Sequence, residues 1–351
     1  MKIKGRGALS NPVGRFAHRE YAPTEEEVES VEGLPTQLHV DVSRTIIARN
    51  RSPDLPFSQS INPYRGCEHG CIYCYARPTH AYLDLSPGRD FETQLYFKPQ
   101  AAKLLRAELT RADYDVSPIA LGTNTDPYQP IERKLEITRS LLELLLELRH
   151  PLTIVTKGAL ILRDLDLLAG LAADKLVSVM VSLTTLDEDL KRRMEPRTAG
   201  PQQRLGVVRE LAGHGIPTGV LLAPIIPGLN DHELEHMVQQ AAECGAHGCG
   251  YVLLRLPYEV KPLFIEWLRE HYPDRAEHVL SLLRQMRGGE LNDPRFHSRQ
   301  RGAGPFADLL RSRFERARRV HGLDDESMFD LNTGLFRRPR RNDGQLELWG
   351  S

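Results

Sequence analysis

The chain alternates apolar runs, rich in β-branched residues, with longer stretches of helical periodicity, and this alternation constrains its fold most. The apolar runs cover residues 119–122, 152–156, 177–183, 219–226 and 251–256. The helical patterns between them cover residues 138–148, 160–172, 201–212 and 231–243. Because continuous apolar strands that alternate with helices are typical of parallel βαβ units, we predict an α/β protein with a parallel sheet.

A sixth strand-like stretch, residues 57–64, leads into a group of cysteines. Six strands predict a partial (β/α)6 barrel of the TIM type, although the alternation alone fits a doubly wound sheet equally well. The place of the cysteines after the first strand favours the barrel, whose sites gather at the carboxyl ends of the strands. We predict a core at residues 57–290, an N-terminal arm at 1–56 and a C-terminal extension at 291–351.

Composition excludes several classes of protein. The 46 Lys+Arg and 47 Asp+Glu residues give a net charge of −1, which argues against a protein that coats a polyanion with its whole surface. Five cysteines in 351 residues are too few for a disulfide-stapled secreted scaffold. The sequence has no apolar run long enough for a membrane span, and its basic start lacks the apolar segment of a signal peptide. We therefore expect a cytoplasmic protein that does not enter a membrane and whose thiols stay reduced or bind metal.

Three of the five cysteines, Cys67, Cys71 and Cys74, form a C-x3-C-x2-C group. Gly66 and Gly70 allow the chain to turn tightly around a bound group. In a reducing compartment, three thiols this close indicate metal ligands rather than disulfide partners. A [4Fe–4S] cluster normally takes four cysteines, so three would leave one iron open to another ligand. An open position is typical of a chemically active metal site.

The alternative is a structural Cys3His zinc site, with His69 or His80 as the fourth ligand. His69 lies only two residues from each neighbouring thiol, a spacing that makes a tetrahedron hard to close. Zinc sites also usually combine two C-x2-C knuckles, whereas this chain has one uneven triplet. The pattern therefore favours iron–sulfur over zinc.

Tyr73 precedes the last cysteine, and the string NPYRGCEHGCIYCYAR at residues 62–77 resembles the radical S-adenosylmethionine (radical SAM) superfamily. Within it, the string resembles the spore-photoproduct-lyase-like branch and a bacterial group of PA0069-type radical SAM proteins. The resemblance covers about residues 57–290. It implies that the open iron chelates the amino and carboxylate groups of S-adenosylmethionine. It also implies that an electron from the cluster cleaves this cofactor to methionine and a 5′-deoxyadenosyl radical, which abstracts a substrate hydrogen.

The resemblance further implies cofactor contacts near the cysteines and after the second strand. Tyr73 would help to position the adenine. Asn124 lies in the polar loop 122–127, which resembles the position where the family binds the amino group of the cofactor. An Asn/Asp-Pro turn that caps the next helix explains this loop equally well.

Polar residues also end the third and fourth strands. Ser182 and Thr184 alternate onto one face, where they resemble ribose and carboxylate contacts, with Glu195 or Arg197 reaching in. Hydroxyls at strand ends are also ordinary helix caps, and surface arginines are usually solvated. Lys157 could reach an acidic group of the substrate, or could be an exposed strand end.

The remaining cysteines, Cys244 and Cys249, bracket His247. They could hold a second metal, but small buried cysteines beside a strand explain them better. No cysteine lies between Cys74 and Cys244. Spore photoproduct lyases use an additional cysteine as a hydrogen donor, and its counterpart cannot be placed here. This departure puts repair of thymine dimers in doubt.

The C-terminal extension is rich in arginine. Residues 295–320 hold eight arginines against Asp308 and Glu315, a local balance of +6. Arginine suits bidentate phosphate contacts, so this segment predicts contact with nucleic acid. The alternative is a solvated amphipathic helix that packs on the barrel. Its apolar stripe would be Phe306, Leu309, Leu310 and Phe314.

The last residues include Gln345-Leu346-Glu347-Leu348-Trp349, which resembles the short peptide that bacterial proteins insert into the pocket of the sliding clamp. Alternating apolar anchors on an extended tail suit such peptide-in-groove binding. Docking of the tail on the protein's own body explains the pattern almost as well.

Together these features predict a radical SAM enzyme, lyase-like, that acts on nucleic acid in DNA repair or modification. Its cofactors would be a [4Fe–4S] cluster and S-adenosylmethionine, and an unidentified partner would supply electrons. Two alternatives stay open. One is a non-catalytic, metal-stabilised protein that binds nucleic acid, and the other is a radical SAM enzyme that acts on a small molecule or peptide.

Overall fold

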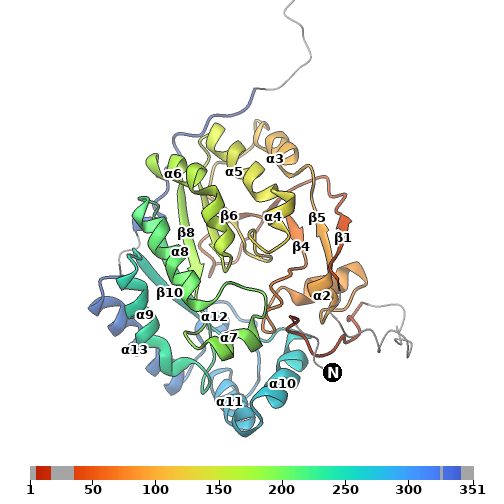
Figure 1. Cartoon of the computed structure of the whole chain (residues 1–351), viewed down its shortest axis with the longest axis vertical. Coiled ribbons are helices and arrows are strands. Elements are labelled where there is room, and N and C mark those ends of the chain that lie inside the picture. Colours follow the sequence, from red (N-terminus) through yellow and green to blue (C-terminus); the bar gives the residue numbers. More distant parts are fainter. Residues whose placement is uncertain (1–4, 17–34, 325–326, 341–351) are drawn as a thin grey trace, which may run out of the picture.

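Six parallel strands and one antiparallel edge strand form the central sheet of the computed structural model, which describes residues 5–16, 35–324 and 327–340 (Figure 1). The order across the sheet is β10-β9-β8-β7-β6-β3-β2, so the sheet is open between β2 and β10. The predicted α/β class and partial barrel of six parallel strands are confirmed. The strands are β2 (Ile47–Arg49), β3 (Gln59–Ile61), β6 (Ile119–Leu121), β7 (Leu152–Thr156), β8 (Val177–Ser182), β9 (Thr218–Ile225) and β10 (Gly248–Leu253).

Helices follow the strands and cover the outer face of the sheet. All six residues of β8 are buried, as expected for a strand that packs on both faces. The helices around the sheet begin and end within a few residues of the predicted ranges, and the second and fourth open with a short 3-10 turn. They are α5 (Ile137–Glu147), η2 (Ala159–Asp164) with α6 (Leu165–Ala173), α8 (Pro201–Gly213), and η3 (Asp231–Glu233) with α9 (Leu234–Glu243). Three others are α3 (Ala101–Leu109), α4 (Glu132–Leu135) and α7 (Glu188–Met194).

A second, smaller sheet holds the start of the cysteine segment. Its order is β1 (Gln37–Val40), β5 (Gln94–Phe97) and β4 (Tyr64–Arg65). The stretch 57–64, predicted as one strand, is therefore two strands in different sheets. Pro63, which has no backbone N–H, lies between β3 and β4. β4 leads directly to Cys67, and η1 (Arg77–Leu83) and α2 (Asp90–Thr93) follow the cysteines.

The described part of the N-terminal arm, residues 5–16, packs against the cysteine segment. The amide groups of Gly7 and Ala8 each donate a hydrogen bond of 2.9 Å to the carboxylate of Glu92. A Cβ atom at Gly7 would lie 1.8 Å from the carbonyl oxygen of Gly70. The arm therefore needs a glycine at this point of closest approach.

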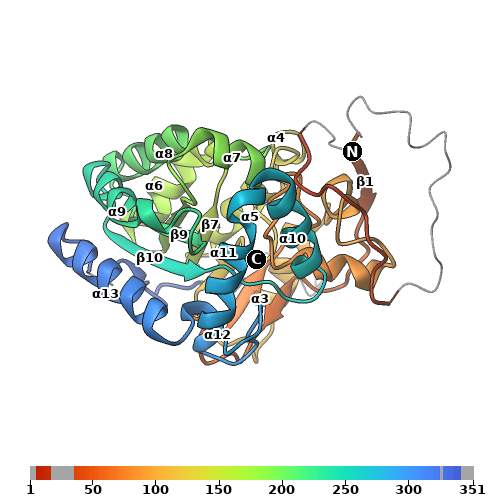
Figure 2. The same ribbon diagram turned by 90° about the horizontal axis from the view of Figure 1, so that it is seen from below.

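Four helices follow the last strand: α10 (Val260–His271), α11 (Pro273–Met286), α12 (Ser298–Arg301) and α13 (Pro305–Val320). Figure 2 shows α13 along the side of the molecule, near α9 and β10. Leu310 and Phe314 of α13 are buried, and Phe306 packs against the core, as predicted. The prediction was wrong for Leu309, which is exposed because the inward stripe consists of positions 307, 310, 314 and 317.

After α13 the chain runs across the amino ends of the strands. We call residues 327–340 the strap; it begins with η4 (Ser327–Phe329) and lies beside α6 in Figure 1. The amide of Arg337 donates to the carbonyl oxygen of Leu148 at 2.8 Å. The ring of Phe336 meets the ring of His150 edge-on, with centroids 5.1 Å apart. No helix in the described part of the chain is long and apolar enough to cross a membrane.

Candidate cofactor site

Cys67, Cys71 and Cys74 carry free thiols on one tight loop at the carboxyl end of the sheet. The amide of Cys67 donates to the carbonyl oxygen of Phe91 at 2.9 Å, and the amide of Cys74 donates to that of Cys71 at 3.2 Å. Gly66 and Gly70 adopt φ angles of +79° and +68°, which favour glycine. The glycines therefore allow the turn that brings the three thiols together, as the sequence predicts.

Burial raises the pKa of all three thiols. Nearby negative groups add to this effect, with Asp126 acting on Cys67 and Glu195 acting on Cys71. The thiolate is the form that binds metal, so the loop favours neutral thiols until a bound cation compensates their charge. Metal binding to this loop should therefore release protons.

The arrangement of possible ligands fits a cluster better than a zinc ion. In the described ranges, no group of three or more His, Cys, Asp or Glu side chains could hold a single metal ion. His69 Nδ1 lies 3.3 Å from the carboxylate of Asp126, and His80 Nε2 lies 2.9 Å from the carbonyl oxygen of Gln94. A zinc ion would draw four donors to within about 2.0–2.3 Å, whereas a [4Fe–4S] cube spreads its ligands over several irons.

A buried ion pair, Arg77 with Glu92, supports the loop from behind. Arg77 Nε donates to the carbonyl oxygen of Cys71 at 2.9 Å, and its Nη2 donates to that of Gly70 at 3.2 Å. The same Nη2 lies 2.5 Å from Glu92 Oε1, and neither side chain is exposed. The sequence gives no signal for this pair, because charged residues are almost never fully buried unless they are paired, and the pairing depends on the fold.

Polar groups from the carboxyl ends of β8 and α7, and from α8, meet beside the loop. The hydroxyl of Tyr73 donates to the carboxylate of Glu195 and lies 3.2 Å from Thr184 Oγ1. Thr184 Oγ1 donates to Glu195 Oε1 at 2.7 Å, and Arg204 pairs with the same carboxylate. Arg204 Nη1 also donates to the carbonyl oxygen of Ser182 at 3.0 Å. The structure thus brings together three predicted contact residues, Tyr73, Ser182 and Thr184.

Two charged side chains define the electrostatics of this group. Burial raises the pKa of the Glu195 carboxyl, and the charge of Arg204 opposes that rise. Lys157 Nζ donates to Ser182 Oγ at 3.0 Å and lies 5.9 Å from the centre of the Tyr73 ring. Lys157 is therefore a half-buried cation that faces the site rather than an exposed strand end.

The other two predicted contact residues lie apart from Ser182 and Thr184. Asn124 is exposed, and its amide donates to Asn62 Oδ1 at 3.0 Å. Arg197 Nη2 lies 3.2 Å from the carboxylate of Glu68, so it borders the cysteine loop. Both residues stay predictions as contacts of the cofactor.

Asp126 is the buried acid of the loop that contains Asn124. Burial disfavours its charge, but His69, the Thr156 hydroxyl and the Lys157 amide together lower the pKa of Asp126 to about 2. Thr156 Oγ1 donates to Asp126 at 2.6 Å, and the Lys157 amide does so at 2.7 Å. Asp126 therefore links the end of β7 to the cysteine loop through His69.

Similarity to a known family identifies the kind of protein that carries this site. The sequence matches the Radical SAM superfamily over residues 61–241. The chain belongs to the radical SAM superfamily. An uncharacterised protein of Mycobacterium tuberculosis strain H37Rv is 40% identical over 243 residues, which cover 68% of this chain and 72% of that protein. A radical SAM Nalpha-GlyT isomerase of Pseudomonas phage M6 is 24% identical over 239 residues, which cover 66% of this chain and 48% of the phage protein.

Solved structures confirm the fold of this radical SAM protein. A spore photoproduct lyase complexed with dinucleoside spore photoproduct superimposes with a TM-score of 0.57 at 18% identity. The match covers 83% of this chain and 85% of the lyase chain. The resemblance to the radical SAM superfamily is thereby confirmed, whereas membership of the PA0069-type group stays a prediction.

The cofactors of this radical SAM protein are those of its superfamily, a [4Fe–4S] cluster and S-adenosylmethionine. Cys67, Cys71 and Cys74 are the residues that would hold the cluster. Tyr73, Ser182 and Thr184 lie together next to them and present hydroxyl groups. The free thiols, the glycine turns and the buried Arg77–Glu92 support all fit a loop built around a bound group.

The other two cysteines lie outside this site. Cys244 and Cys249 are buried, and Arg209 Nη2 lies 3.4 Å from Cys244 Sγ. The ring of His247 faces Thr218 rather than the sulfurs. These contacts support the interpretation of both cysteines as small buried residues.

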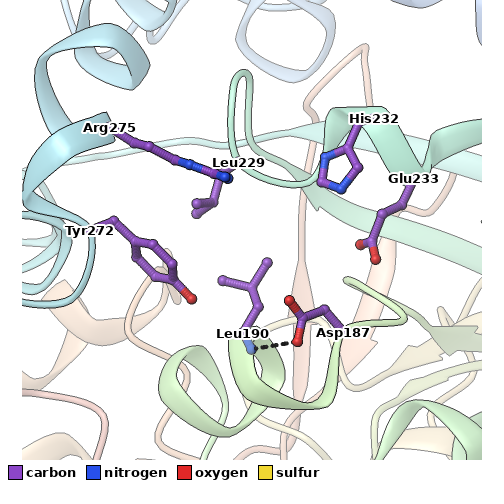
Figure 3. Close-up of a pocket in the computed structure, with 7 residues that line it drawn as sticks. All are labelled: Asp187, Leu190, Leu229, His232, Glu233, Tyr272 and Arg275. Carbon is purple, nitrogen blue, oxygen red and sulfur yellow. Dashed lines mark hydrogen bonds between the residues drawn. The ribbon is translucent and has the colours of Figure 1, made fainter.

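A cavity of about 290 Å³ lies beside α7, which contributes Leu190 to its lining (Figure 3). Tyr272 and Arg275 face His232 and Glu233 across it. Its apolar residues, Leu190 and Leu229, belong to the same buried cluster as Cys71 and Tyr73. The cavity therefore borders the wall that supports the loop, and none of the three cysteines lines it.

Proposed function

We propose that this radical SAM protein modifies or repairs nucleic acid. The observation that carries the chemistry is the loop of three free thiols beside the hydroxyls of Tyr73, Ser182 and Thr184. Two similar proteins support the substrate class. One is named an Nalpha-GlyT isomerase, and the other is a lyase complexed with a dinucleoside photoproduct.

In this proposal the chain's own residues bind and orient the cofactors. The three cysteines would hold the cluster, Tyr73 would help to position the adenine, and Ser182 and Thr184 would contact polar groups of S-adenosylmethionine. Glu195 fixes the hydroxyls of Tyr73 and Thr184, because it accepts a hydrogen bond from each. When bound and reduced, the cluster would supply the one electron for cleavage of S-adenosylmethionine to methionine and a 5′-deoxyadenosyl radical. The source of that electron would be a separate one-electron donor.

The predicted arginine segment contributes less free charge than its composition suggests. Arg295, Arg299, Arg311, Arg313 and Arg318 form ion pairs with Asp293, Asp54, Asp308, Glu235 and Glu315, respectively. Arg301, Arg316 and Arg319 are exposed and form no ion pair with any described residue. Contact between residues 295–320 and nucleic acid therefore stays a proposal that rests mainly on these three arginines.

The test is anaerobic reconstitution with iron and sulfide, followed by reduction in the presence of S-adenosylmethionine. We expect a brown protein that forms 5′-deoxyadenosine, with more product when one class of nucleic acid is added. Cys71→Ala should lose this activity and keep its fold and its nucleic-acid binding. A colourless wild type, or one that never cleaves the cofactor, would refute the chemistry. Stimulation by a peptide or metabolite and by no nucleic acid would refute the substrate class.

We further infer that Gln345–Trp349 binds a bacterial sliding clamp. These residues lie outside the described ranges, so the inference rests on their sequence pattern.

A further inference from the structure

Five exposed aromatic side chains near the cysteine loop each lie beside an arginine. They expose between 46% and 68% of their surface, although aromatic rings usually gain from burial. We call these rings and their arginines the arginine–aromatic strip. It consists of Phe16, Tyr75, Tyr82, Tyr258 and Phe296, with Arg15, Arg255 and Arg299.

One end of the strip gathers three rings around Arg15. The guanidinium carbon of Arg15 lies 4.0 Å from the ring centre of Tyr258, 5.0 Å from that of Phe16 and 5.7 Å from that of Tyr82. The rings of Phe16 and Tyr82 lie 5.0 Å apart, centre to centre. Glu259 holds Arg15 through an ion pair of 3.3 Å. The arm, η1 and the segment after β10 therefore combine to make one surface.

The strip continues past the cysteine loop to α12. Arg255 lies three residues before Tyr258, and its guanidinium is 5.6 Å from the ring centre of Tyr75, which directly follows Cys74. Burial and the nearby charge of Arg299 lower the pKa of Arg255, so the two cations are neighbours. Arg299 lies 4.9 Å from the ring centre of Phe296 and is paired with Asp54.

Two features of the strip, an unpaired hydrogen-bond donor and a strained backbone angle, indicate a binding surface. Arg255 Nε is buried and has no hydrogen-bond partner among the described residues. Tyr258 has a φ angle of +48°, which is a strained conformation for a bulky residue, while its ring stays mostly exposed. Backbone strain of this kind clusters at binding sites, where a ligand uses the side chain that the strain presents.

We propose that the arginine–aromatic strip binds an unpaired strand of nucleic acid, with bases stacked on Tyr258, Tyr82 and Phe296. Every base has a π face, so exposed rings next to guanidinium groups bind single strands with little sequence preference. The free Nε–H of Arg255 would donate a hydrogen bond to a phosphate oxygen or a base oxygen beside the cysteine loop. A closed duplex keeps its bases stacked on one another and could not use these rings. This inference rests on the proposed function, since it names the form of nucleic acid that reaches the site.

The test measures the affinity of the reconstituted full chain for a short fluorescent oligonucleotide, as a single strand and as a duplex. Because stacking contributes about 1–3 kcal/mol per base, Tyr258→Ala and Tyr82→Ala should each weaken single-strand binding by about 5- to 160-fold. Tyr258→Phe should retain binding, because it keeps the ring. The matched control is Phe329→Ala, which removes an exposed aromatic ring from the strap and should bind like the wild type.

The outcomes separate this inference from the proposed function. Equal affinities of wild type, Tyr258→Ala and Tyr82→Ala for the single strand would overturn the strip, even if the wild type forms 5′-deoxyadenosine. Loss of binding only in an Arg316→Gln/Arg319→Gln variant would assign the surface to α13 and also overturn it. Tight duplex binding that Tyr258→Ala leaves unchanged would do the same. A strip that binds single strands in a wild type without cofactor cleavage would uphold the inference and refute the radical chemistry.

Discussion

Replacing Glu92 by Gln tests whether the buried ion pair behind the cysteine loop supports it. The Glu92 carboxylate accepts hydrogen bonds from the amides of Gly7 and Ala8 and pairs with Arg77 at 2.5 Å. A glutamine offers one oxygen in place of two and turns an N–H2 group toward one of these donors. It also leaves the charge of Arg77 buried without its counter-charge.

The expected loss in the free energy of unfolding follows from the burial of this pair. Removing one partner of a buried ion pair destabilises a protein by about 3–5 kcal/mol. Arg77 keeps its carbonyl partners at Cys71 and Gly88, so we expect the lower end of that range. With an unfolding entropy of about 2.1 cal/mol/K per residue, 3–5 kcal/mol in a chain of 351 residues lowers Tm by about 4–7 °C.

Denaturant unfolding of Glu92→Gln and of the wild type, both as apo-proteins, measures this loss of stability. The iron bound per chain after reconstitution is the second readout. The matched control is Glu147→Gln, which removes an ion pair with Arg106 whose side chains are about half exposed. That control should change the free energy of unfolding by less than about 0.5 kcal/mol. If Glu92→Gln unfolds like Glu147→Gln, the pair does not support the loop. If stability falls but iron content does not, the pair stabilises the fold without shaping the site.

Two further predictions concern His150, whose ring packs against Phe336 of the strap, and the tail. Burial lowers the pKa of His150 from 6.5 to about 4, so the stability that its neutral form provides is complete above about pH 6.5 and is lost as pH falls toward 4. The loss amounts to about 3 kcal/mol of the free energy of unfolding. Denaturant unfolding at a series of pH values should show a smaller loss in His150→Gln than in the wild type. Parallel pH curves for the two proteins would contradict this reasoning. Leu346→Ala/Leu348→Ala should weaken binding to an immobilised sliding clamp by about 100-fold or more, since burying each leucine contributes about 1.5–3 kcal/mol. Unchanged binding in that assay would exclude the tail as the clamp ligand.

The sheet could be predicted because its strands are short, apolar and separated by strongly periodic helices. The stretch 57–64 was harder, since its apolar residues do not show that Pro63 ends one strand before another begins. The predicted apolar stripe of α13 wrongly includes Leu309, which is exposed, because hydrophobicity alone does not determine which side of a helix meets the core. Local pattern therefore predicts the elements better than it predicts their boundaries or faces.

The cysteine ligands could be predicted because their spacing is local, but the residues that support them could not. Arg77 meets Glu92 across 15 residues, and Arg299 meets Asp54 across 245 residues. Counting charges within residues 295–320 therefore overstates the free positive charge, since several neutralising partners come from other segments. Long-range ion pairs of this kind become visible only when the fold brings their partners together.

The strap has a consequence for how many molecules this protein can engage at once. Arg338 ends its path with hydrogen bonds to the carbonyl oxygens of Arg111 and Tyr114, before the start of β6. The cysteine loop lies at the carboxyl ends of the same parallel strands. The strap therefore lies behind the sheet, on the side opposite to the cysteine loop. A molecule that binds the strap and a substrate that binds at the cysteine loop would therefore not compete for one surface.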